Sequence, residues 1–249
     1  MKDIDKNNLP KHIAIVLDGN RRWAKDHNLS VRQGHTEGAK NLERIVQFCS
    51  EIGIKYLTVY CFSTENWKRS EEEIKALMLI FSSYLNSFAK KTDKYNIKVN
   101  VIGDPKAFNE RIQRGIKNVV EKTKNNTGLI LNLALNYGGR AEITNAVKQI
   151  AKKIQENEIS VEEITEDMIS NHLYTAGQPD PDLYIRPSAE LRTSNFLPWQ
   201  LIYTEFYFPS KHWPDFDEDE LLLAIKEYQG RNRRFRAVVQ TRKRIERRE

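Results

Sequence analysis

The sequence predicts a single α/β domain in which a mostly parallel central sheet of about six strands is flanked by helices. Short apolar runs alternate along the chain with longer segments whose apolar residues recur every three or four positions, a pattern typical of βαβ units. The short runs are almost continuously apolar, which indicates strands buried on both faces. With 249 residues, 39% of them apolar, the chain is long enough for one substantial core.

The expected strands are the apolar runs at 13–17, 56–62, 99–102, 129–135 and 183–185. A helix is expected between the first two runs, because apolar residues recur there at helical spacing, at Leu42, Ile45, Val46, Cys49 and Ile52. After the second run, Ser70 and Glu73 form the pattern of a capping box. The apolar stripe from Ile74 to Phe88 predicts the helix that this capping box begins.

Further helices are expected at 107–124, at 141–155, at 161–173 and from 217 onward, the last with Asp217 as its N-cap. No internal repeat, low-complexity tract or long linker divides the chain, so residues 1–249 are expected to form one domain with its core at about 12–235. A short polar arm precedes this core. A basic extension follows it, and much of the excess positive charge lies between Arg231 and Arg248.

The start of the chain is polar, and no apolar run approaches the eighteen or so residues that cross a bilayer, so a cytoplasmic protein is expected. Cys49 and Cys61 fall within apolar patterns and are expected to be reduced core thiols without a chemical role. The net charge of +6 favours an anionic partner, which could be nucleic acid, a phosphorylated metabolite or an acidic membrane surface. Charge alone does not choose among them.

Polar clusters follow four of the expected strands, at the sheet edge where open α/β sheets bind ligands. They are Asp18-Gly19-Asn20-Arg21-Arg22-Trp23, the segment 63–69, Asn136-Tyr137-Gly138-Gly139-Arg140 and the segment 186–195. Each cluster supplies arginine to the same edge. Arginines gathered in this way repel one another unless an anion binds, and their forked donors match phosphate oxygens. The clusters therefore predict a polyphosphate site, with Asp18 as the natural first ligand of Mg²⁺.

Common nucleotide-binding modes are not expected, because the chain has neither GxxxxGK[ST] nor a strand-linked GxGxxG. It also lacks the DDxxD pattern of trans-type prenyl synthases. What it does contain, in order, is HIAIVLDGNRRWAK, YLTVYCFSTENWKR, LNYGGRAEI, DLYIR with SNFLPWQLIYTEFYF, and HWPDF. These motifs resemble those of the cis-prenyltransferase family of the undecaprenyl diphosphate synthase type, and the resemblance runs from about residue 12 to residue 235.

The resemblance implies a Mg²⁺-dependent enzyme that condenses isopentenyl diphosphate in cis (Z) geometry onto an allylic diphosphate, farnesyl or shorter. The implied product is a polyprenyl diphosphate of undecaprenyl type, a lipid carrier for cell-wall synthesis. An apolar product tunnel is implied as well, and the 74–88 helix and the 129–135 strand are apolar enough to line it. The resemblance further implies a homodimer that associates loosely with a membrane. Nucleic acid is not an expected partner, because the arginines cluster after the strands.

Residue by residue, the resemblance makes Asp18 a catalytic metal ligand and gives Asn66 a part in proton removal. Glu205 matches a second metal-associated carboxylate. Substrate contacts are implied for Gly19, Asn20, Arg21, Arg22, Trp23, His35, Ser63, Thr64, Glu65, Trp67 and Arg69. Contacts to isopentenyl diphosphate are implied for Arg186, Arg192, Thr193 and Ser194.

The chain departs from the family pattern in three places. An arginine usual four residues before the histidine of the GH pair is Val31 here, with Arg32 next to it. The usual Arg-Thr-Ser-Gly-Glu reads Arg186-Pro187-Ser188-Ala189-Glu190. The chain also continues past Phe235 with a basic extension whose role the pattern does not assign.

Four other interpretations stay open at this point. The altered Arg186 loop is compatible with a short or irregular (branched) prenyl product made by the same fold. A non-catalytic regulatory subunit would tend to lose the carboxylate that Asp18 retains. Nucleic-acid binding would place arginines among exposed aromatics or along one helix. A phosphatase with Asp18 as nucleophile would carry a second aspartate where Asn20 stands.

Overall fold

The computed structural model describes residues 4–231, apart from the side chains at 86–90, 92 and 93. Its centre is a six-stranded sheet in the order β3-β4-β2-β1-β5-β6, and every neighbouring pair of strands is parallel. The strands are β1 (His12–Val16), β2 (Tyr56–Ser63), β3 (Lys98–Ile102), β4 (Ile130–Tyr137), β5 (Leu183–Ile185) and β6 (Glu205–Tyr207). The predicted single α/β domain with a parallel sheet of about six strands is confirmed.

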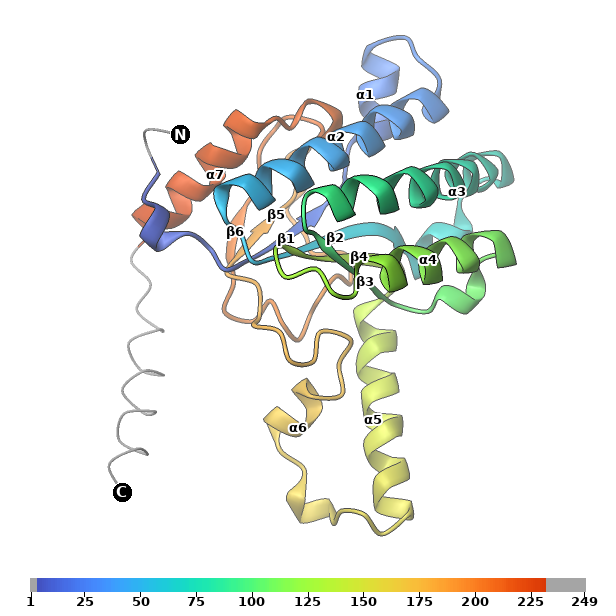
Figure 1. Ribbon diagram of the computed structural model, residues 1–249, viewed down its shortest axis with the longest axis vertical. Helices are drawn as coiled ribbons and strands as arrows, with labels where there is room; N and C mark the ends of the chain where they lie inside the picture. The colour runs from blue at the N-terminus through green and yellow to red at the C-terminus, as the bar shows by residue number, and fades with distance from the viewer. Residues whose placement is uncertain (1–3, 232–249) are drawn as a thin grey trace.

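Seven α-helices connect and cover the strands within the described residues. They are α1 (Asn20–Asp26), α2 (Val31–Ile52), α3 (Glu71–Lys94), α4 (Glu110–Thr123), α5 (Gly139–Gln155), α6 (Glu166–Ser170) and α7 (Glu218–Gly230). Short 3₁₀ turns include η2 (Thr64–Lys68), η4 (Val161–Glu163) and η5 (Trp213–Asp215). Helices α2, α3 and α7 lie along one side of the sheet, whereas α5 and α6 extend away from it on the other side (Figure 1).

Side-chain alternation along the strands divides the core into two parts. On β1, Ile13 and Ile15 belong to the larger apolar cluster, and Ala14 and Val16 belong to the smaller one on the opposite face. The larger cluster takes in residues of α2, α3, α4 and α7. Both faces of the sheet are therefore covered, which is why its strands read as continuous apolar runs.

Local signals set most helix boundaries as expected. The Asp217 side chain accepts from Glu220 N at 2.9 Å, which confirms it as the N-cap of α7. The predicted helix at 107–124 begins only at Glu110, because Asn109 caps it by accepting from Ile112 N. The predicted helix at 161–173 is wrong in its extent. Thr165 accepts from Met168 N and starts a new, short helix, so the segment forms η4 and α6 instead.

β6 was not among the predicted strands, since it has only three residues and one of them, Phe206, is exposed. Both cysteines are free, as predicted, and burial raises the pKa of each thiol to about 12. Among residues 4–231, no helix combines the length and the apolar character needed to cross a membrane. The basic extension beyond Arg231 and the side chain of Phe88 lie outside the described residues.

Candidate active site

A cavity of about 1090 Å³ opens at the carboxyl ends of β1, β2 and β5 and continues between α2 and α3. Its polar lining consists mainly of residues predicted from the strand-end motifs: Asp18, Gly19, Asn20, Arg21, Arg22, His35, Ser63, Glu65, Asn66, Arg69, Arg186, Arg192 and Ser194. Its apolar lining comes mainly from α2, α3 and β4: Leu42, Leu77, Ile80, Phe81, Tyr84, Leu85, Leu133 and Leu135. One cavity thus joins a charged mouth to an apolar interior.

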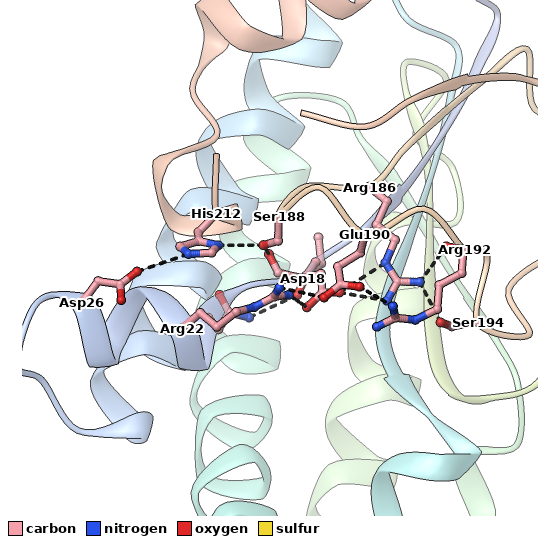
Figure 2. Close-up of polar contacts among 11 residues, drawn as sticks. Asp18, Arg22, Asp26, Arg186, Ser188, Glu190, Arg192, Ser194 and His212 are labelled. Carbon is pink, nitrogen blue, oxygen red and sulfur yellow. Dashed lines mark hydrogen bonds and ion pairs between the residues drawn. The ribbon is translucent and has the colours of Figure 1, made fainter. Parts of the chain in front are cut away.

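Asp18 stands two residues beyond the end of β1 and faces two arginines (Figure 2). Its Oδ2 accepts from Arg186 Nη2 at 2.8 Å and from Arg186 Nε at 3.2 Å, and its Oδ1 accepts from Arg22 Nη2 at 3.0 Å. Gly19 follows at φ +104°, a conformation that favours glycine. The turn at Gly19 is also crowded, because a Cβ added there would lie 2.2 Å from Ser188 Oγ.

Burial acts to raise the pKa of Asp18, but the hydrogen bonds and positive charges of Arg186 and Arg22 outweigh it and hold the pKa below its ordinary value. The carboxylate is therefore ionised at neutral pH. It is also 24% exposed at its side chain, so an incoming cation can reach it.

Arg186 is the most enclosed charge of the site, since its side chain is only 5% exposed. Besides Asp18, its Nη1 donates to Arg192 O and to Ser194 Oγ, both at 2.6 Å. The altered turn that follows adopts positive φ at Ser188 and at Ala189. Backbone bonds hold this turn, from Ser188 N to Lys211 O at 2.8 Å and from Ala189 N to Pro209 O at 2.9 Å. The loop is thus wrapped around one guanidinium.

A second carboxylate, Glu190, joins the arginines at the mouth of the cavity. It accepts from Arg22 Nη1 at 2.7 Å and also pairs with Arg192. Arg22 therefore bridges Asp18 and Glu190 (Figure 2). Glu190 lies in the predicted 186–195 cluster but was not predicted to contact substrate or metal, although its place between two arginines of one loop is a signal for it.

Glu73 organises the opposite wall of the cavity. Its buried carboxylate accepts from Arg69 Nη1 at 2.9 Å, lies 3.2 Å from His35 Nε2 and pairs with Arg21 at 3.5 Å. Burial lowers the pKa of His35, and Arg69 and Arg21 lower it further against the opposing effect of Glu73. The expected Ser70 cap is present, with Ser70 Oγ accepting from Glu73 N at 3.3 Å. Glu73 was not among the predicted site residues. Its position four residues after Arg69 was the signal in the sequence that could have indicated this ion pair.

Several predicted residues support the site from outside the cavity lining. Trp67 donates to Asn136 Oδ1 at 2.8 Å and packs on Phe62. Trp23 donates to Asp215 Oδ1 at 2.8 Å. Thr64 lies beside Gly138, where an added Cβ would be 2.7 Å from its hydroxyl oxygen. Thr193 lies in the Arg186 loop, where its carbonyl accepts from Phe196 N.

The loops after β2 and β4 are joined through Asn195, which ends the predicted 186–195 cluster but was given no individual contact from the sequence. Its side chain donates to Glu65 Oε1 at 3.0 Å and accepts from Arg140 N at 2.9 Å. Asn66 lines the cavity, and its Oδ1 accepts from Ser63 N at 3.0 Å. Val31, in place of the usual arginine, also lines the cavity. Arg32 and Arg140 lie outside the lining, so fewer arginines than expected face the ligand space.

Glu205 is not brought together with Asp18 within the described chain. It begins β6, in register with Leu183 of β5, which is itself in register with Ile13 of β1. Asp18 lies five residues further along the chain than Ile13, beyond the carboxyl end of β1. Glu205 pairs instead with Arg231 at 2.9 Å. Within the described chain these two carboxylates are therefore apart, because Glu205 begins its strand whereas Asp18 follows the carboxyl end of β1, and the metal-associated role of Glu205 stays a prediction.

The donor set at the mouth fits Mg²⁺ bound together with a phosphorylated ligand. Within residues 4–231 no group of three metal-binding side chains is present. An all-protein cage is not required, however, since Mg²⁺ usually keeps several waters and is held by one or two carboxylates plus substrate phosphates. Asp18 supplies such an ionised carboxylate, and the surrounding arginines supply donors for phosphate oxygens.

Comparisons with known proteins agree with this geometry. Residues 16–236 match the prenyltransferase family model, which is described as undecaprenyl diphosphate synthase. The isoprenyl transferase of Clostridium tetani is 50% identical over 235 residues, which cover 94% of this chain and 92% of that protein. The isoprenyl transferase of Clostridium acetobutylicum is 51% identical over 239 residues, which cover 95% and 93%.

Two solved structures are similar over 92% of this chain and 99% of theirs. Lavandulyl diphosphate synthase from Lavandula x intermedia, in complex with dimethylallyl diphosphate, has a TM-score of 0.89 and 38% identity. A probable undecaprenyl diphosphate synthase from Campylobacter jejuni has a TM-score of 0.75 and 34% identity.

Proposed function

Because this chain belongs to the undecaprenyl diphosphate synthase family and is a cis-prenyltransferase enzyme, we propose that it elongates an allylic diphosphate with isopentenyl diphosphate in a Mg²⁺-dependent reaction. The proposed product is a Z-polyprenyl diphosphate of undecaprenyl type. The observation that supports this most is the cavity itself, which joins an arginine-rich mouth to an apolar interior. Such a space suits a molecule with a diphosphate at one end and a hydrocarbon chain at the other.

The proposed reaction breaks the allylic carbon–oxygen bond, forms a carbon–carbon bond from the double bond of isopentenyl diphosphate and releases one proton. Diphosphate leaves with the developing negative charge. Arg22, Arg69 and Arg192 line the mouth and are placed to donate to its oxygens. Mg²⁺, when held by Asp18 and the substrate phosphates, supplies further positive charge against the leaving diphosphate.

The apolar walls would exclude water from the cationic allylic carbon, which water would otherwise capture. The same walls would hold the growing chain. We therefore assign the segment of the cavity between α3 and β4, with Leu85 and Leu133 among its lining, as the product tunnel. Elongation would stop when the growing chain fills the tunnel and meets the side chains that close it.

Asn66 is proposed to orient the isopentenyl unit and not to take its proton. An amide is a poor base, and Asn66 Oδ1 already accepts from Ser63 N. A diphosphate oxygen or a water chain is a better proton acceptor. The isopentenyl diphosphate itself is placed near Arg186, Arg192 and Ser194, which one hydrogen-bonded cluster holds together.

A shorter or irregular product is the second candidate. It is favoured by the similarity to lavandulyl diphosphate synthase and by the altered turn at Pro187 and Ala189. Two isoprenyl transferases at about half identity and the long apolar lining favour the regular, longer product. We also propose a homodimer in the cytoplasm with loose membrane association. The exposed Ile202 and Tyr203 just before the edge strand β6 offer an apolar surface for such contacts.

The test is incubation of the purified chain with Mg²⁺, labelled isopentenyl diphosphate and primers of two to four isoprene units, followed by product chromatography. Asp18→Ala and a reaction with a chelator run in parallel. A ladder that ends at one long Z-polyprenyl diphosphate, and that both controls abolish, is expected. A single branched ten-carbon product would establish the second candidate, and no incorporation with any primer would overturn both.

A further inference from the structure

Outside the cavity lining, the side chains of Asp26, His212 and Ser188 form a series of polar contacts that ends on the backbone carbonyl of Asp18 (Figure 2). Asp26 Oδ2, at the end of α1, lies 3.3 Å from His212 Nε2. His212 Nδ1 lies 2.8 Å from Ser188 Oγ, and Ser188 Oγ donates to Asp18 O at 3.2 Å. None of the three lines the cavity.

The direction of each hydrogen bond follows from the number of protons available. Ser188 has one hydroxyl proton, and Asp18 O, a carbonyl oxygen, can only accept. The hydroxyl oxygen must then accept from His212, so Nδ1 of the imidazole carries a proton. Nε2 faces the Asp26 carboxylate on the other side of the ring. Asp18 O receives a second bond from Trp213 N at 2.9 Å.

The order of serine, histidine and aspartate resembles a hydrolytic triad, but the geometry excludes that chemistry. A nucleophilic serine needs a nitrogen that accepts its proton and an open approach for the substrate. Here the hydroxyl proton points to Asp18 O, and Nδ1 is the donor. Ser188 is 7% exposed, and a Cβ added at Gly19 would lie 2.2 Å from its hydroxyl oxygen. Ser188 and His212 therefore fix the position of the Asp18 backbone and do not act as nucleophile and base.

The segment that carries His212 is itself firmly anchored. Trp213 is fully buried, and its indole Nε1 donates to Gly38 O on α2 at 2.7 Å. Asn41 of α2 donates to the carbonyls of Trp213 and Phe216. His212 therefore extends from a fixed base toward the turn of Asp18. Gly19 allows this approach, since an added Cβ would lie 2.8 Å from His212 Nδ1.

We propose that His212 is a positioning residue for Asp18, acting through Ser188. The donor at Nδ1 fixes the Ser188 hydroxyl, which with Trp213 N holds the Asp18 carbonyl and so sets the direction of the carboxylate toward the cavity. This inference rests on the proposed role of Asp18 in the reaction. A misplacement of a reacting group by about 1 Å can cost about a hundredfold in rate. Loss of the His212 donor is expected to lower kcat about tenfold, with KM changed less than threefold.

Two substitutions separate the two nitrogens of His212. In His212→Asn the amide nitrogen takes the position of Nδ1 and can still donate to Ser188, whereas His212→Gln reaches toward Asp26 and leaves Ser188 without its donor. We expect kcat to fall about tenfold in His212→Leu and in His212→Gln, and to be largely restored in His212→Asn. The matched control is His172→Leu, which removes a histidine whose Nδ1 contacts Met168 O of α6; its kcat should stay within twofold. Equal losses in the Asn and Gln variants would overturn the proposal.

A double-mutant cycle tests the route through Ser188. Because His212 acts through that hydroxyl, His212→Leu is expected to cost nothing further in a Ser188→Ala chain. Additive losses would mean that His212 acts in some other way. Thermal unfolding of every variant, measured in parallel, shows whether kcat merely follows stability, which a purely structural role would require.

A ¹⁵N NMR spectrum of the full chain gives a readout that does not depend on activity. A proton on Nδ1 of His212 is expected in the parent chain, and an unprotonated Nδ1 would overturn the proposed hydrogen bond. If the parent forms no product, or if Asp18→Ala is as active as the parent, the proposed function fails instead. The NMR result would still decide the hydrogen-bond chain in that case.

Discussion

The guanidinium of Arg186 meets a single carboxylate oxygen of Asp18 with two of its nitrogens, Nη2 at 2.8 Å and Nε at 3.2 Å. The third nitrogen, Nη1, donates to Arg192 O and Ser194 Oγ on the loop that follows. One planar, buried cation thus joins the end of β1 to the loop after β5. Few other side chains could do this, because the contact uses donors in three directions.

We therefore expect Arg186→Lys to lower kcat/KM about a hundredfold, since an ammonium cannot reach Asp18 and both loop acceptors together. Steady-state kinetics of isoprenyl transfer measure this. Arg114→Lys is the matched control, because Arg114 is exposed and pairs with Glu110 one turn earlier in α4. A loss below threefold in Arg186→Lys would show that charge alone suffices at this position.

Glu73→Gln is expected to raise KM for the allylic diphosphate about tenfold, with kcat changed less. The substitution keeps the size of the side chain but removes the negative charge that holds Arg69 and Arg21 together beside His35. The two like charges would then repel and shift. Glu71→Gln provides the control, because Glu71 lies at the start of the same helix and pairs with Lys75 at the surface. An unchanged KM in Glu73→Gln would show that Glu73 has no part in substrate binding.

Ile80→Trp is expected to shorten the product by at least one isoprene unit. Ile80 is half-buried and lines the cavity, so a larger side chain would fill part of the proposed tunnel. Its neighbour Leu79 is 56% exposed, which makes Leu79→Trp a control from the same helix. Product chromatography compares the chain lengths, and the first condensation step should stay within threefold in both variants. Identical products from both chains would place the growing chain elsewhere.

Buried His12 should make the protein less stable in mild acid. Burial lowers its pKa from 6.5 to about 4, against smaller opposing effects of Pro179 O and Asp182. Between these two pH values the unfolded chain binds a proton that the folded chain does not, so the free energy of unfolding rises with pH. The difference amounts to about 3 kcal/mol, lost as the pH falls from 6.5 to 4.

Urea unfolding across this pH range measures that effect. His12→Gln is expected to flatten the dependence relative to the parent, even though it also lowers stability at neutral pH by disturbing the bonds to Pro179 O and Thr58 Oγ1. His172→Gln, at a position with a local helix contact, should keep the parental slope. The same slope in the His12→Gln chain would contradict the assignment.

The fold was largely predictable because its signals are local. Apolar runs such as that of β1 and caps such as Asp217 act over a few residues, so they can be read along the chain. β6 was not predicted because it has only three residues and one of them, Phe206, is exposed, so its sequence shows no clear strand pattern. The 161–173 helix was overextended because Thr165, a capping residue, begins a second segment there.

The sequence predicted which residues belong to the candidate site better than it predicted which of them contact one another. Parallel strands bring their carboxyl ends to one edge, so the loops with Asp18, Asn66 and Arg186 could be expected together. The same rule places Glu205 at the amino-terminal ends of the strands, away from these loops, because Glu205 begins β6. The sequence motif alone did not distinguish the two ends of β6.

By itself, the sequence determined the α/β class, the parallel sheet and the set of arginines and carboxylates that follow its strands. These depend on periodicity and on residue type, which are properties of neighbours in the chain. Only the tertiary structure decided which polar groups distant in sequence pair: Glu190 with Arg22, and His212 with Ser188. Hydrogen bonds and ion pairs require approach to about 3 Å, and for residues such as Glu190 and Arg22, far apart in sequence, only the packing of the whole chain sets that distance.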